Sequence, residues 1–155
     1  MGKLAVGKAV PTFSLPSTSG ASWSPADAAG SKLVVYFYPK DMTTGCTLES
    51  QQFRDLHAAY RRASITIVGI SRDGLASHKK FREKERLPFD LLSDEDEKVC
   101  KVFDVIQEKP LYGRKYMGIE RSTFLIDGEG VLRREWRKVK VQGHAEEVLE
   151  AAKSL

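Results

Sequence analysis

The chain is poor in the residues that stabilise small secreted proteins and metal centres. It contains two cysteines and three histidines among 155 residues. Two cysteines cannot form a disulfide scaffold, so we expect a reducing, cytoplasmic compartment. The same scarcity disfavours a zinc site, because structural zinc sites take about four Cys or His ligands. We therefore expect no metal and no cofactor.

Long apolar runs are also missing. No run approaches the roughly 18 apolar residues of a membrane span, and Met1 to Val10 lacks an apolar stretch of signal-peptide length. We therefore expect no membrane partner. The length of 155 residues, with 41% hydrophobic and 30% charged residues, predicts one globular domain over residues 1–155 with a proper core.

The excess of positive charge is small and does not predict nucleic-acid binding. The formal net charge is +4 at pH 7. Its densest part lies at residues 131–141, where basic residues alternate with apolar ones in an approximately strand-like pattern. No aromatic-interleaved platform accompanies the charge. The basic residues are therefore predicted to form the solvated face of a strand.

The most informative segment that is present runs from Leu33 to Cys46. Residues 33–38 form a β-branched and aromatic run of strand length. Pro39 cannot donate a hydrogen bond to a central ladder, so the strand should end there. Residues 43–45, Thr-Thr-Gly, then favour a cap or a turn.

A helix is predicted to follow over residues 46–62. Spacings of 3, 4, 3 and 4 define one face of this helix, which carries Cys46, Glu49, Phe53, Leu56 and Tyr60. Cys46 then lies in the first turn, where free backbone N–H groups and the helix dipole stabilise an anion. This setting favours a reactive thiolate. A small core cysteine is the competing interpretation, and it does not explain the Pro, Thr and Gly residues before the cysteine.

The remainder of the chain alternates strands and helices. Further strands are predicted at 65–70, 89–92, 123–126 and 131–139, and further helices at 77–85, after a cap at 93–96 to about 103, and at 145–155. Residues 11–22 are predicted to form a short hairpin, 24–27 a helix start, 127–130 a turn and 108–119 a loop. This order predicts a mixed α/β sheet covered on both faces.

At this point the sequence resembles a known family. Pro39, Thr43 and Cys46 form a PxxxTxxC signature, and YFYPKDMTTGCT is similar to the active-site segment of peroxiredoxins of the bacterioferritin-comigratory-protein (PrxQ) subfamily of the AhpC/TSA family. Matching segments continue in the family's order to Gly118–Asp127. The resemblance implies a thioredoxin-like fold of the peroxiredoxin type with an N-terminal β-hairpin extension.

The resemblance also implies an activity and partners. The chain is expected to be a thiol-dependent peroxidase that reduces hydrogen peroxide and organic hydroperoxides through a sulfenic acid on Cys46. Its partners would be the peroxide and a thiol reductant, either thioredoxin, glutaredoxin or a small thiol. It would act as a monomer or weak homodimer.

Catalytic roles follow from the same resemblance. Cys46 is expected to be the peroxidatic nucleophile. Thr43 is expected to place its hydroxyl beside the sulfur and the attacked oxygen, and Arg121 to stabilise the thiolate and the developing negative charge.

Three further residues are expected to shape the active site. Pro39 and Gly45 belong to the turn that shields the sulfur. Glu49 lies one helical turn below Cys46 on the same inward face, where a charged residue needs a partner. Arg121 is one candidate for that partner, and the dipole of the first helical turn is the alternative.

The resolving cysteine of the family is missing at both of its usual positions. Gln51 stands at one position and about Arg82 at the other. We therefore expect a one-cysteine cycle in which an external thiol reduces Cys46. The remaining thiol, Cys100, is predicted to be a core residue. The alternative is a two-cysteine cycle in which Cys100 resolves Cys46, which requires Cα atoms within about 7 Å.

Other functional classes fit less well. A disulfide reductase needs a CxxC centre, which the chain lacks. A Cys-His hydrolase could use His57, His78 or His144, yet none of them has a local protease-type signature. A non-enzymatic binding or chaperone-like protein of the same fold is the remaining alternative. Rapid labelling of one thiol by iodoacetamide at pH 6 would separate the two, because a scaffold cysteine reacts slowly.

Overall fold

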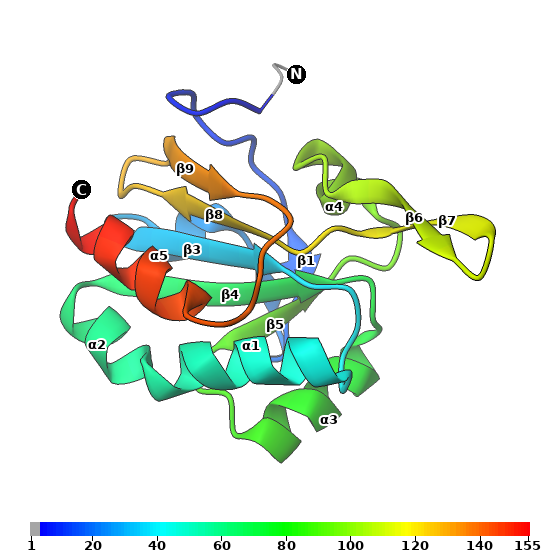
Figure 1. Cartoon of the computed structure of the whole chain (residues 1–155). Helices are drawn as coiled ribbons and strands as arrows, with labels where there is room; N and C mark the ends of the chain where they lie inside the picture. The colour runs from blue at the N-terminus through cyan, green and yellow to red at the C-terminus, as the bar shows by residue number, and fades with distance from the viewer. Residues whose placement is uncertain (1–3) are drawn as a thin grey trace.

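A five-stranded mixed sheet forms the centre of the structure, a computed structural model that describes residues 4–155 (Figure 1). The strand order is β5-β4-β3-β8-β9, with β3, β4 and β5 parallel and β8 antiparallel to both of its neighbours. The strands are β3 (Lys32–Phe37), β4 (Ile65–Ser71), β5 (Asp90–Ser93), β8 (Ser122–Ile126) and β9 (Leu132–Trp136). The continuous apolar runs of β3 and β4 suit strands that are covered on both faces.

Alternate side chains of β3 enter two separate cores, one on each face of the sheet. Val34 and Tyr36 belong to one core, and Leu33 and Val35 to the other, because successive side chains of a strand point to opposite faces. The first core is covered by α1 (Thr44–Asp55), α2 (His57–Arg62), α3 (Leu75–Glu85) and α5 (His144–Lys153), and the second by α4 (Lys98–Val102). The predicted α/β sheet with two covered faces is thus confirmed.

The N-terminal extension completes the cover of the second face. β1 (Leu15–Pro16) and β2 (Ser22–Trp23) form an antiparallel hairpin, and the 3-10 helix η1 (Pro25–Ala28) follows. Leu15 and Trp23 are buried in the second core. The predicted hairpin is present but shorter than residues 11–22. The predicted helix start is a single 3-10 turn, in which the Asp27 carboxylate accepts a 2.8 Å hydrogen bond from the Ser24 N–H.

One edge of the sheet gathers the segments that matter below. The carboxyl ends of the three parallel strands lie along it, since Phe37 pairs with Ile70 and Ser71 with Ser93. The start of β8 lies at the same edge, because Ser122 pairs with Phe37. Residues that follow β3, β4 and β5, or precede β8, therefore converge there.

The prediction of a loop over residues 108–119 is wrong. β6 (Ile106–Leu111) and β7 (Arg114–Ile119) form a two-stranded hairpin that projects from the body of the molecule (Figure 1). Its turn is Tyr112-Gly113, and both residues have positive φ, 49° and 78°, as a two-residue hairpin turn of type I′ requires. Pro110 and Gly118 disguise the strands in the sequence, because both residues are unfavourable in strands.

The helix predicted over residues 46–62 is two helices. α1 begins at Thr44, two residues earlier than predicted, and α2 follows after a bend at Leu56. The hydrogen-bond ladder continues across the bend, since the Tyr60 N–H donates to the Leu56 carbonyl at 3.0 Å. Periodicity alone cannot detect such a bend. None of the helices described within residues 4–155 has the length and hydropathy needed to cross a bilayer.

The helix predicted to start in the acidic segment 93–96 begins later, at Lys98. Asp94 stays outside the helix, and its carboxylate accepts hydrogen bonds from the backbone N–H groups of Val99 and Cys100 at 3.2 and 2.7 Å. Glu97, just before the helix, has a left-handed φ of 64°. A cap supplied from five residues upstream has no fixed sequence spacing, which explains the error.

Candidate active site

Cys46 lies in the first turn of α1, at the edge of the sheet where β3, β4 and β5 end. Thr43 is the extended residue that precedes the helix, and its carbonyl accepts a 2.9 Å hydrogen bond from the Thr47 N–H. The residue Cys46 is 1% exposed and packs in the first core. The sulfur thus lies where the helix dipole and free N–H groups favour an anion.

The Arg121 guanidinium connects the sulfur to a buried carboxylate. Arg121 immediately precedes β8. Its Nη2 donates to Cys46 Sγ at 3.4 Å, and its Nη1 donates to Glu49 Oε1 at 2.7 Å. A cation at this distance favours the thiolate, so the site combines two independent sources of positive charge around one sulfur.

Glu49 is the most constrained residue of this group. Its side chain is 1% exposed, and no described residue donates to its Oε2. Burial raises the pKa of Glu49 to about 7, although the neighbouring Arg121 acts to lower it. The pKa of Arg121 is raised, because Glu49 and Cys46 outweigh the lowering effect of burial. Protonation of Glu49 near neutral pH therefore changes the charge next to Arg121.

A pH-dependent stability follows from the raised pKa of Glu49. A carboxyl that binds its proton more tightly in the folded state contributes stability at acidic pH, and this stability is lost as pH rises from about 4.5 to about 7. We expect the free energy of unfolding of the wild type, relative to Glu49→Gln, to fall between pH 5 and pH 8. Urea unfolding of both proteins across this range measures the difference. A difference that is constant with pH would contradict the raised pKa.

Gly45 leaves the space that the guanidinium occupies. A Cβ atom at this position would lie 3.0 Å from Arg121 Nη2, closer than a relaxed contact. The same guanidinium is held by Cys46 and Glu49, so it cannot move without weakening one of these contacts. The small residue thus leaves room for the close approach of Arg121.

We expect Gly45→Ala to slow peroxide reduction by about tenfold, because a displaced guanidinium acts less well on the sulfur. Thr44→Ala is the matched control, since Thr44 is exposed in the same helical turn, and it should change the rate by less than about twofold. The measurement is the second-order rate constant for hydrogen peroxide. Equal rates in the two variants would show that the space at Gly45 does not affect the rate of peroxide reduction.

Thr43 and Pro39 border the site from the loop between β3 and α1. The Thr43 hydroxyl donates to the Lys40 carbonyl at 2.8 Å, which leaves its oxygen lone pairs able to accept a hydrogen bond. Thr43 is exposed, whereas Pro39 is half-buried directly after β3 and Tyr38. The Thr43 hydroxyl is therefore exposed and can still accept a hydrogen bond, three residues before Cys46.

Cys100 is separated from Cys46 by the sheet. Cys46 packs in the first core and Cys100 in the second, on the opposite face. Cys100 is fully buried, and burial together with the Asp94 carboxylate raises the pKa of its thiol. Both thiols are free. A bond between them requires one cysteine to cross to the other side of β3.

The two positions at which the family resemblance led us to expect a resolving cysteine bind other partners here. Gln51 donates to the Glu85 carboxylate at 2.8 Å, which connects α1 to the end of α3. Arg82 donates from Nε to the Phe89 carbonyl at 3.0 Å. Both side chains thus hold the C-terminal end of α3 in place.

The histidines lie in three different environments. His144 Nε2 is 2.7 Å from the Thr123 hydroxyl, and burial lowers the pKa of His144 to about 4. His57 packs near the Phe89 ring. His78 binds Asp41 and the Leu92 carbonyl. Each histidine thus contacts other groups, and the described partner of the Cys46 sulfur is Arg121.

Sequence analysis missed a buried polar cluster next to the loop. Asp41, Asp73 and His78 offer ligand atoms within 4.8 Å of one another, so they could hold a metal ion. Asp41 and His78 already bind each other, and Asp73 accepts hydrogen bonds from the Asp41 N–H and the Ser71 hydroxyl. A cation would have to replace these contacts. The only sequence signal was the presence of Ser71-Arg72-Asp73 and Ser77-His78 among the segments that resemble the family.

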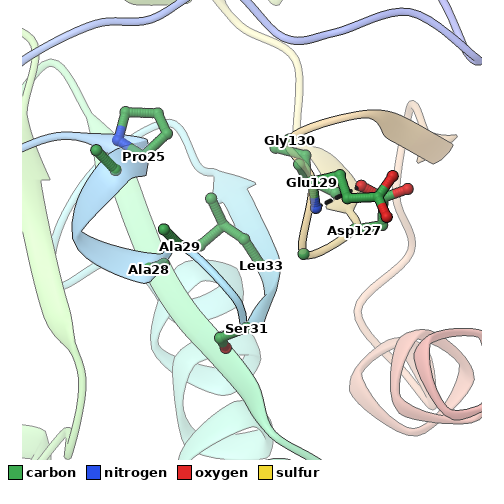
Figure 2. Close-up of a pocket in the computed structure, with 11 residues that line it drawn as sticks. Pro25, Ala28, Ala29, Ser31, Leu33, Asp127, Glu129 and Gly130 are labelled. Atoms are coloured by element: carbon green, nitrogen blue, oxygen red, sulfur yellow. Dashed lines mark hydrogen bonds between the residues drawn. The ribbon is translucent and has the colours of Figure 1, made fainter.

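A pocket of about 200 Å³ lies at the other end of β3 (Figure 2). Leu33 at the start of the strand lines it, together with η1 and the turn between β8 and β9. Of the two acidic side chains in this turn, that of Asp127 accepts hydrogen bonds from the backbone N–H groups of Glu129 and Val131 at 3.0 Å each. The pocket is therefore separate from Cys46, which follows the opposite end of β3.

Comparison with known proteins gives a consistent result. The model of the AhpC/TSA family matches residues 6–135. The chain is 48% identical over 144 residues to the putative peroxiredoxin bcp of Coxiella burnetii, which covers 93% of this chain and 95% of that protein. It is 47% identical over 150 residues to peroxiredoxin Bcp of Bacillus subtilis, with 97% and 96% covered.

Solved structures agree with this similarity. Peroxiredoxin Q of Xanthomonas campestris superposes with a TM-score of 0.87 at 47% identity, over 92% of this chain and 90% of that one. A cysteine-to-serine mutant of PrxQ of Xylella fastidiosa gives a TM-score of 0.92 at 39% identity, over 99% and 98%. The predicted thioredoxin-like fold of the peroxiredoxin type is thereby confirmed.

Proposed function

The chain belongs to the AhpC/TSA family as a peroxiredoxin of the Bcp type, a thiol-dependent peroxidase, and from this premise we propose that Cys46 is its nucleophile and Arg121 its main electrostatic partner. The observation that carries the proposal is the 3.4 Å contact between Arg121 Nη2 and Cys46 Sγ at a helix N-terminus. A thiolate, and not a thiol, attacks a peroxide.

The proposed reaction consumes one peroxide and oxidises one sulfur. The Cys46 thiolate attacks one peroxide oxygen, the S–O bond forms, and the O–O bond breaks. The leaving hydroxide or alkoxide takes up a proton and departs as water or an alcohol, while Cys46 becomes a sulfenic acid. Arg121 stabilises the negative charge that moves onto the oxygens, and the Thr43 hydroxyl oxygen accepts the hydrogen bond of the incoming peroxide. Pro39, Gly45 and Glu49 hold the turn and the guanidinium.

We propose a one-cysteine cycle for the return to the thiol. An external thiol attacks the sulfenic acid, which releases water and forms a mixed disulfide, and a second thiol then releases Cys46 as a thiolate. The position of Cys100 on the opposite face of the sheet supports this cycle, since disulfide geometry needs Cα atoms within about 7 Å. The alternative is a cycle in which Cys100 resolves Cys46 after local unfolding.

The physiological setting is part of the proposal. Two free cysteines fit a cytoplasmic compartment. Thioredoxin, glutaredoxin or a small thiol would supply the electrons, and organic hydroperoxides would be reduced along with hydrogen peroxide. A structural study of the Xanthomonas campestris bacterioferritin comigratory protein names its alkyl peroxide reduction activity, which supports the wider substrate range. We propose that the chain works as a monomer or weak homodimer.

The test is the intact mass of the reduced protein after one equivalent of hydrogen peroxide, with and without a sulfenic-acid trap. We expect one trap adduct, located on the peptide that contains Cys46. A loss of two hydrogens without an adduct, with Cys46 and Cys100 in one cross-linked peptide, would establish the two-cysteine cycle. No mass change within seconds would contradict Cys46 as a peroxidatic nucleophile.

A further inference from the structure

We infer that His78 is a positioning residue that fixes the active-site loop through a buried hydrogen bond to the Asp41 carboxylate. The loop is the segment between β3 and α1, residues 38–43, which leads into Cys46. The inference deepens the proposed function and rests on it. It adds a role for a histidine that does not touch the sulfur.

Asp41 is the anchor of the loop. It is 5% exposed, and its carboxylate is surrounded by donors. Its Oδ1 accepts a hydrogen bond from the Tyr38 hydroxyl at 2.6 Å, and its Oδ2 accepts one from the Ser77 hydroxyl at 2.9 Å. His78 Nδ1 lies 2.7 Å from the same Oδ2. Two of these partners come from α3, so the loop is attached to that helix.

The hydrogen bonds of His78 locate its protons. Nε2 lies 2.9 Å from the Leu92 carbonyl oxygen, which can only accept, so Nε2 carries a hydrogen. Nδ1 faces a carboxylate oxygen at 2.7 Å, where two lone pairs would repel each other, so a proton lies between them. One proton is therefore shared between His78 Nδ1 and Asp41 Oδ2, and both side chains are buried, at 0% and 1% exposed.

The loop needs an anchor because its backbone is strained. Met42 follows Asp41 and has a φ of 64°, a left-handed conformation that costs free energy for a residue other than glycine. The Asp41 N–H also donates to Asp73 Oδ2 at 2.9 Å, so both the backbone and the side chain of Asp41 are held. If the side-chain contact is lost, Met42 can relax and change the direction in which the chain enters Thr43 and α1.

Loss of this anchor is expected to affect the reaction of Cys46 with peroxide more than the formation of its thiolate. The thiolate is stabilised by the first turn of α1 and by Arg121, which precedes β8 and does not depend on the loop. Attack on a peroxide also requires the Thr43 hydroxyl and the sulfur in line with the O–O bond, and a misplacement of about 1 Å can cost about 100-fold in rate. A weakened anchor should therefore slow oxidation by peroxide and leave alkylation nearly unchanged.

Two isosteric substitutions separate the two contacts of His78. In His78→Asn the amide nitrogen takes the place of Nδ1 and can still donate to Asp41. In His78→Gln the amide nitrogen reaches the place of Nε2 and can donate to the Leu92 carbonyl, while Asp41 loses its partner. Both variants are neutral and similar in size, so a general effect on packing should be shared between them.

The experiment measures the second-order rate constants of Cys46 with hydrogen peroxide and with iodoacetamide at pH 7. We expect His78→Gln to lower the peroxide rate at least about tenfold and the alkylation rate less than about threefold. His78→Asn should restore the peroxide rate to within about threefold of the wild type. Equal peroxide rates in the two variants, or an equal fall of both rates in His78→Gln, would overturn the inference.

Two further measurements test the inference even if a His78 variant fails to fold. Ser77→Ala removes one donor to Asp41 from the half-buried start of α3, and a fall of about threefold or more in the peroxide rate with unchanged alkylation is expected. In the wild type, ¹⁵N–¹H correlation spectra should show hydrogens on both ring nitrogens of His78. An unchanged peroxide rate or an unprotonated Nδ1 would overturn the inference. Failure of the proposed function is distinguishable, because the wild type itself would then leave peroxide unreacted.

Discussion

Replacement of Cys46 by serine is expected to abolish peroxide reduction, with a fall of at least about 10⁴-fold in the second-order rate constant. A serine hydroxyl stays protonated beside Arg121 and is a far weaker nucleophile than a thiolate. The change of one atom preserves the packing of α1, so the thermal midpoint of unfolding should move by only about a few degrees. Peroxide consumption coupled to a thiol reductant measures the rate.

Cys100→Ser is the matched control, because it makes the same chemical change in the other core. We expect it to keep the peroxide rate within about twofold, since the sheet separates this side chain from Cys46. Its cost should appear in stability and stay below about 3 kcal/mol, because the neighbouring Asp94 carboxylate can accept a hydrogen bond from the buried hydroxyl. A loss of turnover in Cys100→Ser with an intact first oxidation step would mean that Cys100 takes part in the cycle.

Replacement of Arg121 by methionine is expected to lower the peroxide rate by about 10²–10³-fold. The substitution removes the cation 3.4 Å from the sulfur and keeps a side chain of similar length. It also leaves Glu49 buried without its ion-pair partner, which costs up to about 3–5 kcal/mol of stability at a pH where Glu49 stays ionised. Stopped-flow oxidation and urea unfolding measure the two effects separately.

The double variant Arg121→Met with Glu49→Gln separates chemistry from folding. A neutral amide removes the unpaired buried charge, so most of the lost stability should return. The peroxide rate should stay low, because no cation has been restored near the sulfur. Recovery of the rate together with the stability would show that Arg121 acts only by holding Glu49.

Elements with strong local signals could be predicted from the sequence. The apolar run of β3 and the residues that end it at Pro39 located the turn before Cys46, and the periodicity that follows located α1 to within two residues at its start. These signals arise from short-range rules on backbone conformation and side-chain period. The long, periodic segments were therefore the reliable ones.

Features that depend on contacts between distant residues could not be predicted. The β6–β7 hairpin is defined by two positive φ angles at Tyr112-Gly113 and by pairing between strands that contain a proline and a glycine. Asp41 and His78 are 37 residues apart in the chain, and neither has a pattern that marks it as a partner of the other. Packing brings them together, and sequence spacing carries no trace of it.

The active site shows the same division. Cys46 is marked by its own neighbourhood in the sequence, whereas Arg121 is an ordinary arginine until the fold brings it 75 residues back to the sulfur. The resemblance to a family supplied what local patterns lack. Gly45 is intermediate, because a turn residue was expected there but the guanidinium that needs its space was not.

Because Cys100 is buried, the rate at which a reagent labels its thiol reports how often the surrounding structure opens. The thiol is fully buried with a raised pKa, so a thiol reagent can modify it only after α4 separates from the second core. In a Cys46→Ser background the labelling rate then equals the opening equilibrium constant multiplied by the rate for a free thiol, when reclosing is fast. The labelling rate thus reports the fraction of native molecules in which Cys100 is open to the reagent, without denaturant.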